Sequence, residues 1–427
     1  MRVSQCMIVK NEEANIERAL SWGKGFVWEQ IVVDTGSTDQ TVDIAKSMGA
    51  CVYDLEWADD FAAARNFAMS LAKGDWIALL DADEYFAPQD VKTLETLLTQ
   101  LHGTETEAIA AACINLNEKG KPGSIATQIR VFRNKPELRY RRRIHEQLLA
   151  EEGRRPMRVL DATKELSVFH TGYCGEAYQK KNVSKRNLRL LQKELEDHPG
   201  DSEILGYLGD EYHSAGQSGR AEQYYRQAIE AMPSVLDELD ARSAATFTYL
   251  LQILGDRQAP DEEIDRIYSK GERLLPGEAD FDYIMGRSFA SRGEYEKGAA
   301  HLELALAKLE RFGTNNRSMR LQAGIQDAYE VLALCYLNQG ELQKGIHCSI
   351  AVLKYAPHST TSLVVLLKCL KGDREEPATP ADQTTAFLSK LYDMKSSADR
   401  QILATAAKTL GWPALERALE ASFSGSL

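Results

Sequence analysis

Three carboxylates within four residues form the sharpest chemical feature of the sequence. Asp81, Asp83 and Glu84 follow the apolar run Trp76–Leu80, which has the composition of a strand buried on both faces. Carboxylates crowded at a strand end repel one another, and a divalent cation relieves this repulsion because it takes oxygen ligands readily. Since ligands of open α/β sheets bind outside the carboxyl ends of the strands, the sequence predicts a metal site here. A solvated acidic turn is the alternative.

A second acidic residue, Asp34, ends the apolar run Ile31–Val33 and begins the sequence DTGSTD. The glycine and the hydroxyl groups of this segment would let a ligand approach the backbone closely. The same residues are typical of a turn followed by a helix cap. Two acidic strand ends in one half of the chain favour the metal interpretation over an isolated turn.

The sequence argues against three other kinds of site that have a recognisable residue spacing. A phosphate-binding GxxxxGK[ST] loop is absent, and no GxGxxG follows the first expected strand, which argues against a dinucleotide site. Asp81 and Asp83 also have the spacing of a haloacid-dehalogenase-type phosphatase. That family has Thr or Val at the position that Tyr85 takes here.

The first 170 residues alternate between strand and helix signals. Short apolar or β-branched runs predict four strands, at residues 2–9, 31–34, 50–55 and 75–81. Segments with helical apolar spacing separate them, at residues 12–22, 41–48 and 61–72. Strands separated by helices of this length predict βαβ units and a mostly parallel sheet.

The second half of the chain is helical and repetitive. Strand signals end near Gly175, where the basic, amphipathic segment Glu176–Asp197 begins. Beyond it, residues recur at the offsets of the 34-residue tetratricopeptide repeat, with the best copies at 205–233 and 329–357 and weaker ones at 241–276 and 286–305. We therefore predict an α/β domain at 1–174, a linker helix at 175–199, repeats at 200–373 and C-terminal helices at 374–427.

Length and composition indicate a globular protein of two or three domains. The 427 residues are 44% apolar, and the formal net charge is −12, which argues against general nucleic-acid binding. No apolar run approaches the roughly 18–20 residues of a membrane-spanning helix, and the N-terminal apolar stretch is too short for a signal peptide. The seven cysteines are scattered and lack CxxC spacing, which fits reduced thiols better than disulfides or a zinc site. We therefore expect a cytoplasmic protein.

Three segments together resemble a known family. They are MIVKNEE, VVDTGSTDQT and DFAAARNFAMSLAKGDWIALLDADE. In order and spacing they resemble the glycosyltransferase family 2 catalytic domain, which has the GT-A fold, over about residues 1–172. The addition of tetratricopeptide repeats is similar to a bacterial subgroup that includes peptide S-glycosyltransferases of glycopeptide bacteriocins. The expected fold is an α/β, Rossmann-like GT-A domain with a mostly parallel sheet, followed by an all-α repeat domain.

The resemblance implies a nucleotide-sugar donor, usually a UDP-sugar, with Mn²⁺ or Mg²⁺. The residues carried over to the donor site are Val9, Lys10, Asn11, Glu12, Asp34, Arg65 and Asp81. Asp81 and Asp83 match the family's Asp-x-Asp, with Asp83 on the metal and Asp81 on the ribose or metal. His170, in VFHTGY, is the third expected metal ligand, and neutral imidazole suits Mn²⁺ better than Mg²⁺. Purely structural roles for Arg65 and His170 are the alternatives.

The resemblance also implies an inverting transfer, which needs a base to take the acceptor proton. Glu146 is the expected base and Glu84 its rival, while His145 and Asp83 complete the expected catalytic set. A helix cap or an ion pair is the alternative role for Glu146. Residues 130–158 hold ten Lys and Arg against four acids. They would attract diphosphate or an acidic acceptor, or form a solvated edge.

The repeats predict a concave surface of the kind that binds polypeptides, so the expected acceptor is a peptide or protein side chain. Self-association as a homodimer is a second use of that surface. Two other functions stay open. One is transfer to a lipid or polysaccharide, although no integral membrane segment is expected. The other is a non-catalytic repeat scaffold with a domain that binds a nucleotide-sugar.

Overall fold

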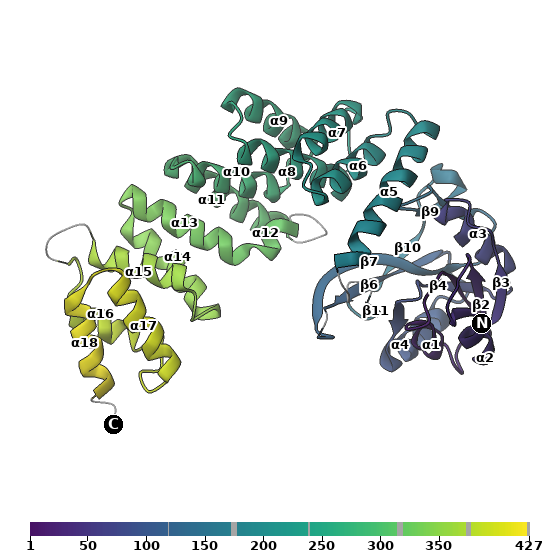
Figure 1. Ribbon diagram of the computed structural model, residues 1–427, viewed down its shortest axis with the longest axis horizontal. Helices are drawn as coiled ribbons and strands as arrows, with labels where there is room; N and C mark the ends of the chain where they lie inside the picture. The colour runs from purple at the N-terminus through teal and green to yellow at the C-terminus, as the bar shows by residue number, and fades with distance from the viewer. Residues whose placement is uncertain (118, 172–176, 238–239, 314–318, 373–376, 425–427) are drawn as a thin grey trace. The chain divides into compact units, whose positions relative to one another are not determined.

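The computed structural model describes all residues except 118, 172–176, 238–239, 314–318, 373–376 and 425–427 (Figure 1). Its contacts divide the chain into two compact units, Met1–Gln217 and Ser218–Leu427. The predicted end of the α/β domain, at residue 174, lies outside the described residues. The four-part division of the chain therefore stays a prediction.

A nine-stranded sheet forms the centre of the first unit. Its strands are β1 (Val3–Val9), β2 (Glu29–Asp34), β3 (Cys51–Asp54), β4 (Trp76–Leu79), β5 (Glu84–Phe86), β6 (Ala108–Leu116), β7 (Pro122–Arg133), β10 (Val159–Asp161) and β11 (Ser167–His170). Their order is β3-β2-β1-β4-β7-β6-β11-β5, with β10 beside β6. The first four strands run parallel, as predicted, whereas β7 and β5 run antiparallel to their neighbours.

Helices cover both faces of the parallel half of the sheet. They are α1 (Ile16–Ser21), α2 (Thr41–Ser47), α3 (Phe61–Leu71) and α4 (Pro88–Gln100). Successive strand residues point to opposite faces. In β1, Met7 and Val9 share a core with residues of α1 and α2, whereas Cys6 shares one with residues of α3. Every side chain of β4 is buried, which confirms the prediction of a strand buried on both faces.

Most strands after α4 escape prediction from the sequence. β6 has the sequence AIAAACINL and β7 begins PGSIAT, and both are rich in residues that are depleted in strands. The second half of β7, TQIRVFR, does contain the β-branched and aromatic residues typical of a strand. Pairing of β6 with β7, β10 and β11 outweighs its weak local preference. A separate two-stranded sheet joins β8 (Leu138–Arg141) to β9 (Gln147–Ala150).

Helices make up the rest of the described chain. In the first unit they are α5 (Ala177–Asp197) and α6 (Ser202–Ser214). In the second they are α7 (Ser218–Ala231), α8 (Ala241–Asp256), α9 (Asp261–Leu274), α10 (Ala279–Ser291), α11 (Tyr295–Phe312), α12 (Met319–Ala323), α13 (Ile325–Gln339), α14 (Leu342–Tyr355), α15 (Thr360–Lys371), α16 (Ala381–Leu388), α17 (Ser397–Thr409) and α18 (Pro413–Ser424). Each predicted repeat coincides with a pair of successive helices. A Cβ built on Gly286 of α10 would lie 2.6 Å from the Leu302 side chain of α11, so glycine permits this close packing.

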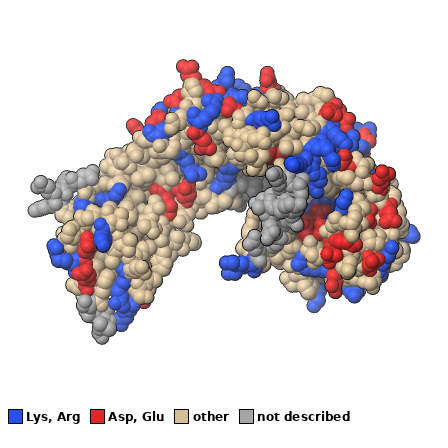
Figure 2. Space-filling model, in the orientation of Figure 1, with Lys and Arg blue, Asp and Glu red and all other residues tan. Residues whose placement is uncertain are grey.

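No helix within the described ranges is both long and apolar enough to cross a membrane. The longest, α5, is instead basic, and Figure 2 shows Lys and Arg side chains gathered over it. Arg189 and Lys193 of α5 form ion pairs with Asp59 at 2.5 and 2.7 Å. Part of this basic face is therefore engaged by the α/β domain.

The fully buried Glu107 carboxylate predicts an acid-sensitive fold. Arg155 donates Nη1 and Nη2 to its two oxygens, at 2.7 and 2.8 Å, and these hydrogen bonds lower the pKa of Glu107 to about 2. The stabilisation is complete above the ordinary pKa of 4.5 and is lost as the pH falls towards 2. We expect Glu107→Gln to lower the free energy of unfolding by about 1.5–3 kcal/mol at pH 7 and by less at pH 3. Urea unfolding measures both values, with the exposed Glu105→Gln as the near-neutral control, and a pH-independent difference would contradict the prediction.

Candidate functional site

The carboxyl ends of β1, β2, β4 and β11 bring the predicted residues to one edge of the sheet. β1, β2 and β4 are parallel, with Val9 opposite Asp34. β11 runs in the same direction, because two antiparallel pairings, β4 with β7 and β7 with β6, precede its parallel pairing with β6. The predicted residues that end these strands or follow them are Lys10, Asn11, Glu12, Asp34, Asp81, Asp83 and His170.

Hydrogen bonds tie the loop after β1 to the loop after β2. Asn11, in the left-handed conformation with φ +58°, donates its backbone N–H to Ser37 Oγ at 2.9 Å and accepts from Thr38 N at 2.8 Å. The Glu12 backbone N–H donates to Thr41 Oγ1 at 2.7 Å. The two loops therefore form one rim, where the family resemblance expects the nucleoside.

Asp34 and Val9 hold the loop after β2 in place through hydrogen bonds. The buried Asp34 carboxylate accepts from Gly36 N and Ser37 N, both at 3.0 Å, and Gly36 has φ +99°, which suits glycine. The Val9 carbonyl accepts from Thr35 N and Oγ1 at 2.9 and 3.0 Å. Lys10 is exposed at the rim. Direct contacts of Val9, Lys10 and Asp34 with a nucleoside stay predictions.

Glu12 lies within electrostatic reach of the acidic motif. Burial raises the pKa of Glu12, and the charges of Asp83 and Asp81 raise it further, against a hydrogen bond from Asn15 Nδ2 at 2.9 Å. β1 and β4 are neighbouring parallel strands, so the loop after β1 and the turn after β4 lie at the same edge of the sheet.

Two buried arginines hold the carboxylates of the acidic motif in what we call the arginine–carboxylate cluster. Arg130 donates Nε and Nη2 to Glu84, both at 2.7 Å, and Nη2 lies 3.4 Å from Asp81 Oδ2. Arg65 donates Nη2 to Asp81 at 2.8 Å and Nε to Glu146 at 2.6 Å. Burial works against the charge on Asp81, but the two arginines outweigh it and lower the pKa of Asp81. Burial raises the pKa of Glu84.

Two buried polar atoms beside this cluster have no hydrogen-bond partner among the described residues. They are Arg65 Nη1 and Tyr140 Oη. The Arg65 guanidinium carbon lies 5.4 Å from the centroid of the Tyr140 ring, and burial raises the pKa of Tyr140. Buried polar groups without partners are rare in folded proteins. They mark a place where a ligand oxygen or a water molecule fits.

Asp83 lies apart from the arginines and faces His170. Asp83 Oδ2 is 3.2 Å from His170 Nε2, and His170 Nδ1 is 2.7 Å from Asn115 Oδ1. Asn115 Nδ2 donates to Ser124 Oγ at 2.9 Å, which orients the amide. Because an amide oxygen only accepts, Nδ1 carries the hydrogen, and Nε2 of neutral imidazole turns a lone pair towards Asp83. Two acceptors this close require a proton or a cation between them, and the hydrogen bond to Asp83 raises the pKa of His170.

The structure brings two of the three predicted metal ligands together. Both oxygens of Asp81 are occupied by arginines, whereas Asp83 and His170 are adjacent. Within the described ranges, no three His, Cys, Asp or Glu side chains lie close enough to hold a metal ion. A carboxylate and an imidazole oriented from behind by an amide are suitable ligands for Mn²⁺ or Mg²⁺. The donor chemistry therefore fits the implied ion at Asp83 and His170, and the role of Asp81 on the metal stays a prediction.

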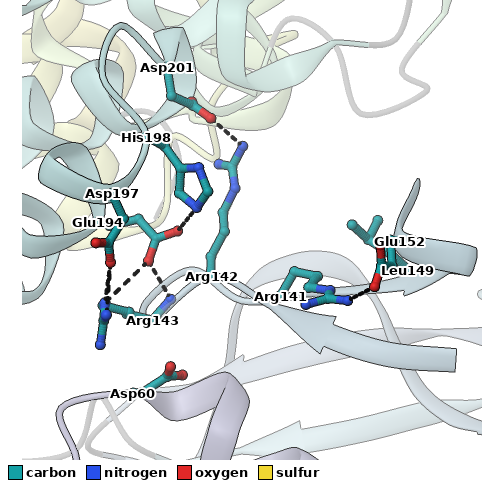
Figure 3. Close-up of a pocket in the computed structure, with 10 residues that line it drawn as sticks. All are labelled: Asp60, Arg141, Arg142, Arg143, Leu149, Glu152, Glu194, Asp197, His198 and Asp201. Carbon is teal, nitrogen blue, oxygen red and sulfur yellow. Dashed lines mark hydrogen bonds and ion pairs between the residues drawn. The ribbon is translucent and has the colours of Figure 1, made fainter. Parts of the chain in front are cut away.

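The loop between β8 and β9 is held by α5 and by the start of α6 (Figure 3). Arg142 pairs with Asp201 at 3.1 Å and with Glu203 at 2.7 Å, and Arg143 pairs with Asp197 at 2.8 Å. The loop and these helices border a hollow of about 430 Å³. These ion pairs fix the part of the chain that leads to the predicted base.

His145 and Glu146 lie at the end of this loop and make different contacts. The His145 backbone has φ +52°, and its ring stacks on Tyr207 of α6, with centroids 3.7 Å apart and planes at 7°. Glu146, the next residue, pairs with Arg65 in the arginine–carboxylate cluster. The ion pair weighed as an alternative role for Glu146 is thus present, and the catalytic roles of both residues stay predictions.

The sequence reasoning did not single out Arg130, Tyr140 or Asn115. Arg130 is one of ten basic residues in a stretch of 29, so charge alone could not separate it from its exposed neighbours. Its place in β7, two residues after the buried oxygen of Gln128, gave the available signal. Polar residues two apart in a strand share one face, so Gln128 and Arg130 point to the same side of β7.

Comparison with known proteins agrees with this geometry. Residues 4–158, which lie within the α/β region, match the model of the glycosyl transferase family 2. A TPR repeat-containing protein of Synechococcus elongatus is 35% identical over 275 residues, which are 62% of this chain and 64% of that protein. The SPbeta prophage-derived glycosyltransferase SunS of Bacillus subtilis is 27% identical over 229 residues, 52% of each chain. The chain thus spans about half to two thirds of these relatives.

Among solved structures, Staphylococcus aureus TarS 1–349 in complex with UDP-GlcNAc is similar over 64% of this chain and 91% of that one. The sequence identity is 16% and the TM-score 0.37. A likeness this low carries no weight for donor or acceptor. The similarity to glycosyl transferase family 2 therefore rests on the match to residues 4–158.

Proposed function

We propose that the protein is a metal-dependent, inverting glycosyltransferase that moves a sugar from a UDP-sugar to a peptide or protein side chain. The observation that carries the proposal is the pair Asp83 and His170, whose acceptor atoms face each other at 3.2 Å. Asp83 and His170 would hold a divalent cation, which would supply positive charge to a diphosphate. The family match over residues 4–158 supports transfer chemistry at this edge.

On the donor side, the rim of Asn11, Glu12 and Asp34 would hold the nucleoside. A Mn²⁺ or Mg²⁺ ion held by Asp83 and His170 supplies positive charge for the leaving nucleoside diphosphate. The unsatisfied Nη1 of Arg65 is a buried donor for an oxygen of the donor substrate. Arg65 and Arg130 keep Asp81 ionised beside it.

On the acceptor side, Glu146 is our proposed base. Its side chain is 14% exposed, and Arg65 binds Oε1 and keeps the carboxylate in one orientation, so Oε2 would receive the acceptor proton. Attack opposite the leaving diphosphate then inverts the anomeric carbon. Glu84, its rival, is 2% exposed and held at both oxygens by Arg130, which makes it the poorer candidate.

The helical repeats motivate the choice of a polypeptide acceptor, since stacked helix pairs present extended surfaces to polypeptides. Self-association through the repeats stays a prediction, as does a cytoplasmic location. Transfer to a lipid or polysaccharide and a non-catalytic scaffold are the competing functions, and nothing among the described contacts favours either.

The proposed donor site is tested by calorimetric titration of UDP into the full chain. We expect binding with Mn²⁺ that weakens at least about tenfold in excess chelator and in Asp83→Ala, because each removes the cation bridge to the diphosphate. Asp54→Ala is the matched control, since Asp54 ends the parallel strand β3 but is exposed and has no assigned role. Equal affinity in all four conditions would overturn the metal site. A folded protein that binds no nucleotide would overturn the proposed donor site.

A further inference from the structure

The second unit contains a cationic hollow that the proposed reaction does not use. It lies between α7 and α9, has a volume of about 640 Å³ and is bordered by Arg226, Arg266, Lys270 and Arg273 with a single acid, Glu230. This local excess of positive charge lies in a chain with a net charge of −12. It attracts anionic ligands and repels cationic ones.

The basic residues of α9 form one stripe. Arg266, Lys270 and Arg273 are spaced by four and three residues, and side chains at these spacings share one face of a helix. The exposed acids Glu262 and Asp265 of the same helix do not border the hollow. The charged side chains of α9 that border the hollow are therefore all positive.

Two of the four cations are already engaged and two are not. Arg226 pairs with Glu222 at 2.8 Å and with Glu263 of α9, and Lys270 Nζ donates to the Ile229 carbonyl at 2.6 Å. Arg266 and Arg273, both exposed, have no ion pair or hydrogen bond with any described residue. Arg226 and Lys270 are therefore held in place beside the hollow. The guanidinium groups of Arg266 and Arg273 are available to bind carboxylates through two hydrogen bonds each.

The hollow also has an apolar part. Ile229 of α7 and Ile267 of α9 border it, 3% and 7% exposed. Because these two side chains are almost buried, they form only a small part of the surface, and the separation of the cations favours an extended chain with several carboxylates over a small inorganic anion. Arg266 and Arg273 are two helical turns apart, about 10 Å, which spans roughly three residues of an extended peptide.

We infer that the α7–α9 hollow docks an acidic segment of a polypeptide, with Arg266 and Arg273 binding its carboxylates. That this polypeptide is the acceptor of the sugar rests on the proposed function; the docking itself does not. It identifies a docking surface formed by the second helices of two predicted repeats. Docking there would raise the local concentration of the acceptor at the enzyme.

The test uses the full chain and a fluorescein-labelled peptide of twelve alternating Glu and Ala residues, measured by fluorescence anisotropy without any donor. We expect saturable binding that weakens with salt, and that weakens about tenfold in Arg266→Glu/Arg273→Glu. Arg311→Glu/Arg417→Glu makes the same charge change at exposed positions of the second unit away from the hollow, and should bind like the parent. A peptide with Gln in place of Glu should not bind.

Three results would overturn the inference: no binding of the acidic peptide, equal loss in both double variants, or stronger binding to anionic lipid vesicles than to the peptide. The last would assign the surface to a membrane. Circular dichroism of each variant confirms that it is folded. Because UDP and metal are absent from the assay, peptide binding and the donor site succeed or fail independently.

Discussion

Asp83→Ala is expected to reduce sugar transfer or donor hydrolysis by at least about 10²-fold while leaving the melting temperature nearly unchanged. The Asp83 carboxylate is 24% exposed and faces His170, so its loss removes a metal ligand but little packing. The turn itself is held by the Asp83 carbonyl, which accepts from Thr171 N and Oγ1 at 3.0 and 3.1 Å. These hydrogen bonds survive the substitution. Release of UDP from a panel of UDP-sugars measures the rate, and calorimetry the melting temperature.

Two control variants distinguish a catalytic role of Asp83 from a structural one. Asp83→Asn keeps the shape of the side chain and removes its charge, so it should be nearly as inactive as Asp83→Ala. Asp54→Ala, at the end of β3, should retain the parental rate within about twofold. Full activity in both Asp83 variants would show that Asp83 is no part of the catalytic site. Inactivity together with a large fall in melting temperature would assign Asp83 a structural role instead.

Arg130→Met, unlike Asp83→Ala, should destabilise the fold, by about 3–5 kcal/mol. Arg130 neutralises Glu84, which is 2% exposed and accepts two hydrogen bonds from it at 2.7 Å. Without this partner, Glu84 is a buried charge with no ion pair and retains the hydrogen bond from the Asp81 backbone N–H at 3.1 Å; burial already raises the pKa of Glu84. In a unit of about this size, the melting temperature should fall by roughly 10 °C. Urea unfolding gives the free energy directly.

A double-mutant cycle isolates the cause of this loss. Glu84→Gln/Arg130→Met removes both charges, so it should recover most of the stability that Arg130→Met alone loses. Arg141→Met is the matched control, since Arg141 pairs with Glu152 while 48% exposed, and exposed pairs contribute about 0–1 kcal/mol. If the double variant is no more stable than Arg130→Met, the packing of the long side chain, and not its charge, stabilises this region.

The two predictions separate neighbouring carboxylates by their surroundings. Asp83 is partly exposed and faces an imidazole, whereas Glu84 is buried under a guanidinium group. A chain segment with three acids therefore contains one side chain suited to binding an ion and one that stabilises the fold. The pH matters for the first, because a raised His170 pKa means that a proton competes with a cation at Nε2.

Local sequence determined the elements and the outline of the site. The run Trp76–Leu80 is apolar at every position and formed a buried strand, so the acids after it had to meet the sheet edge. The loop after β1 and the segment DTGSTD follow parallel strands, and parallel strands end at one edge. The recurring small and aromatic residues of the second half likewise predicted helix pairs at the observed places. These features depend on periodicity and burial, which a sequence displays directly.

Tertiary structure alone decided which carboxylate does what. Asp81 meets Arg130, 49 residues away, and Arg65 meets Glu146, 81 residues away. These contacts require β7 to pair with β4 in the observed register, and a shift by one residue would turn Arg130 to the other face. They also require α5 and α6 to hold the loop that ends at Glu146. Register and long-range ion pairs arise from the whole packed chain, so no local pattern of residue types records them.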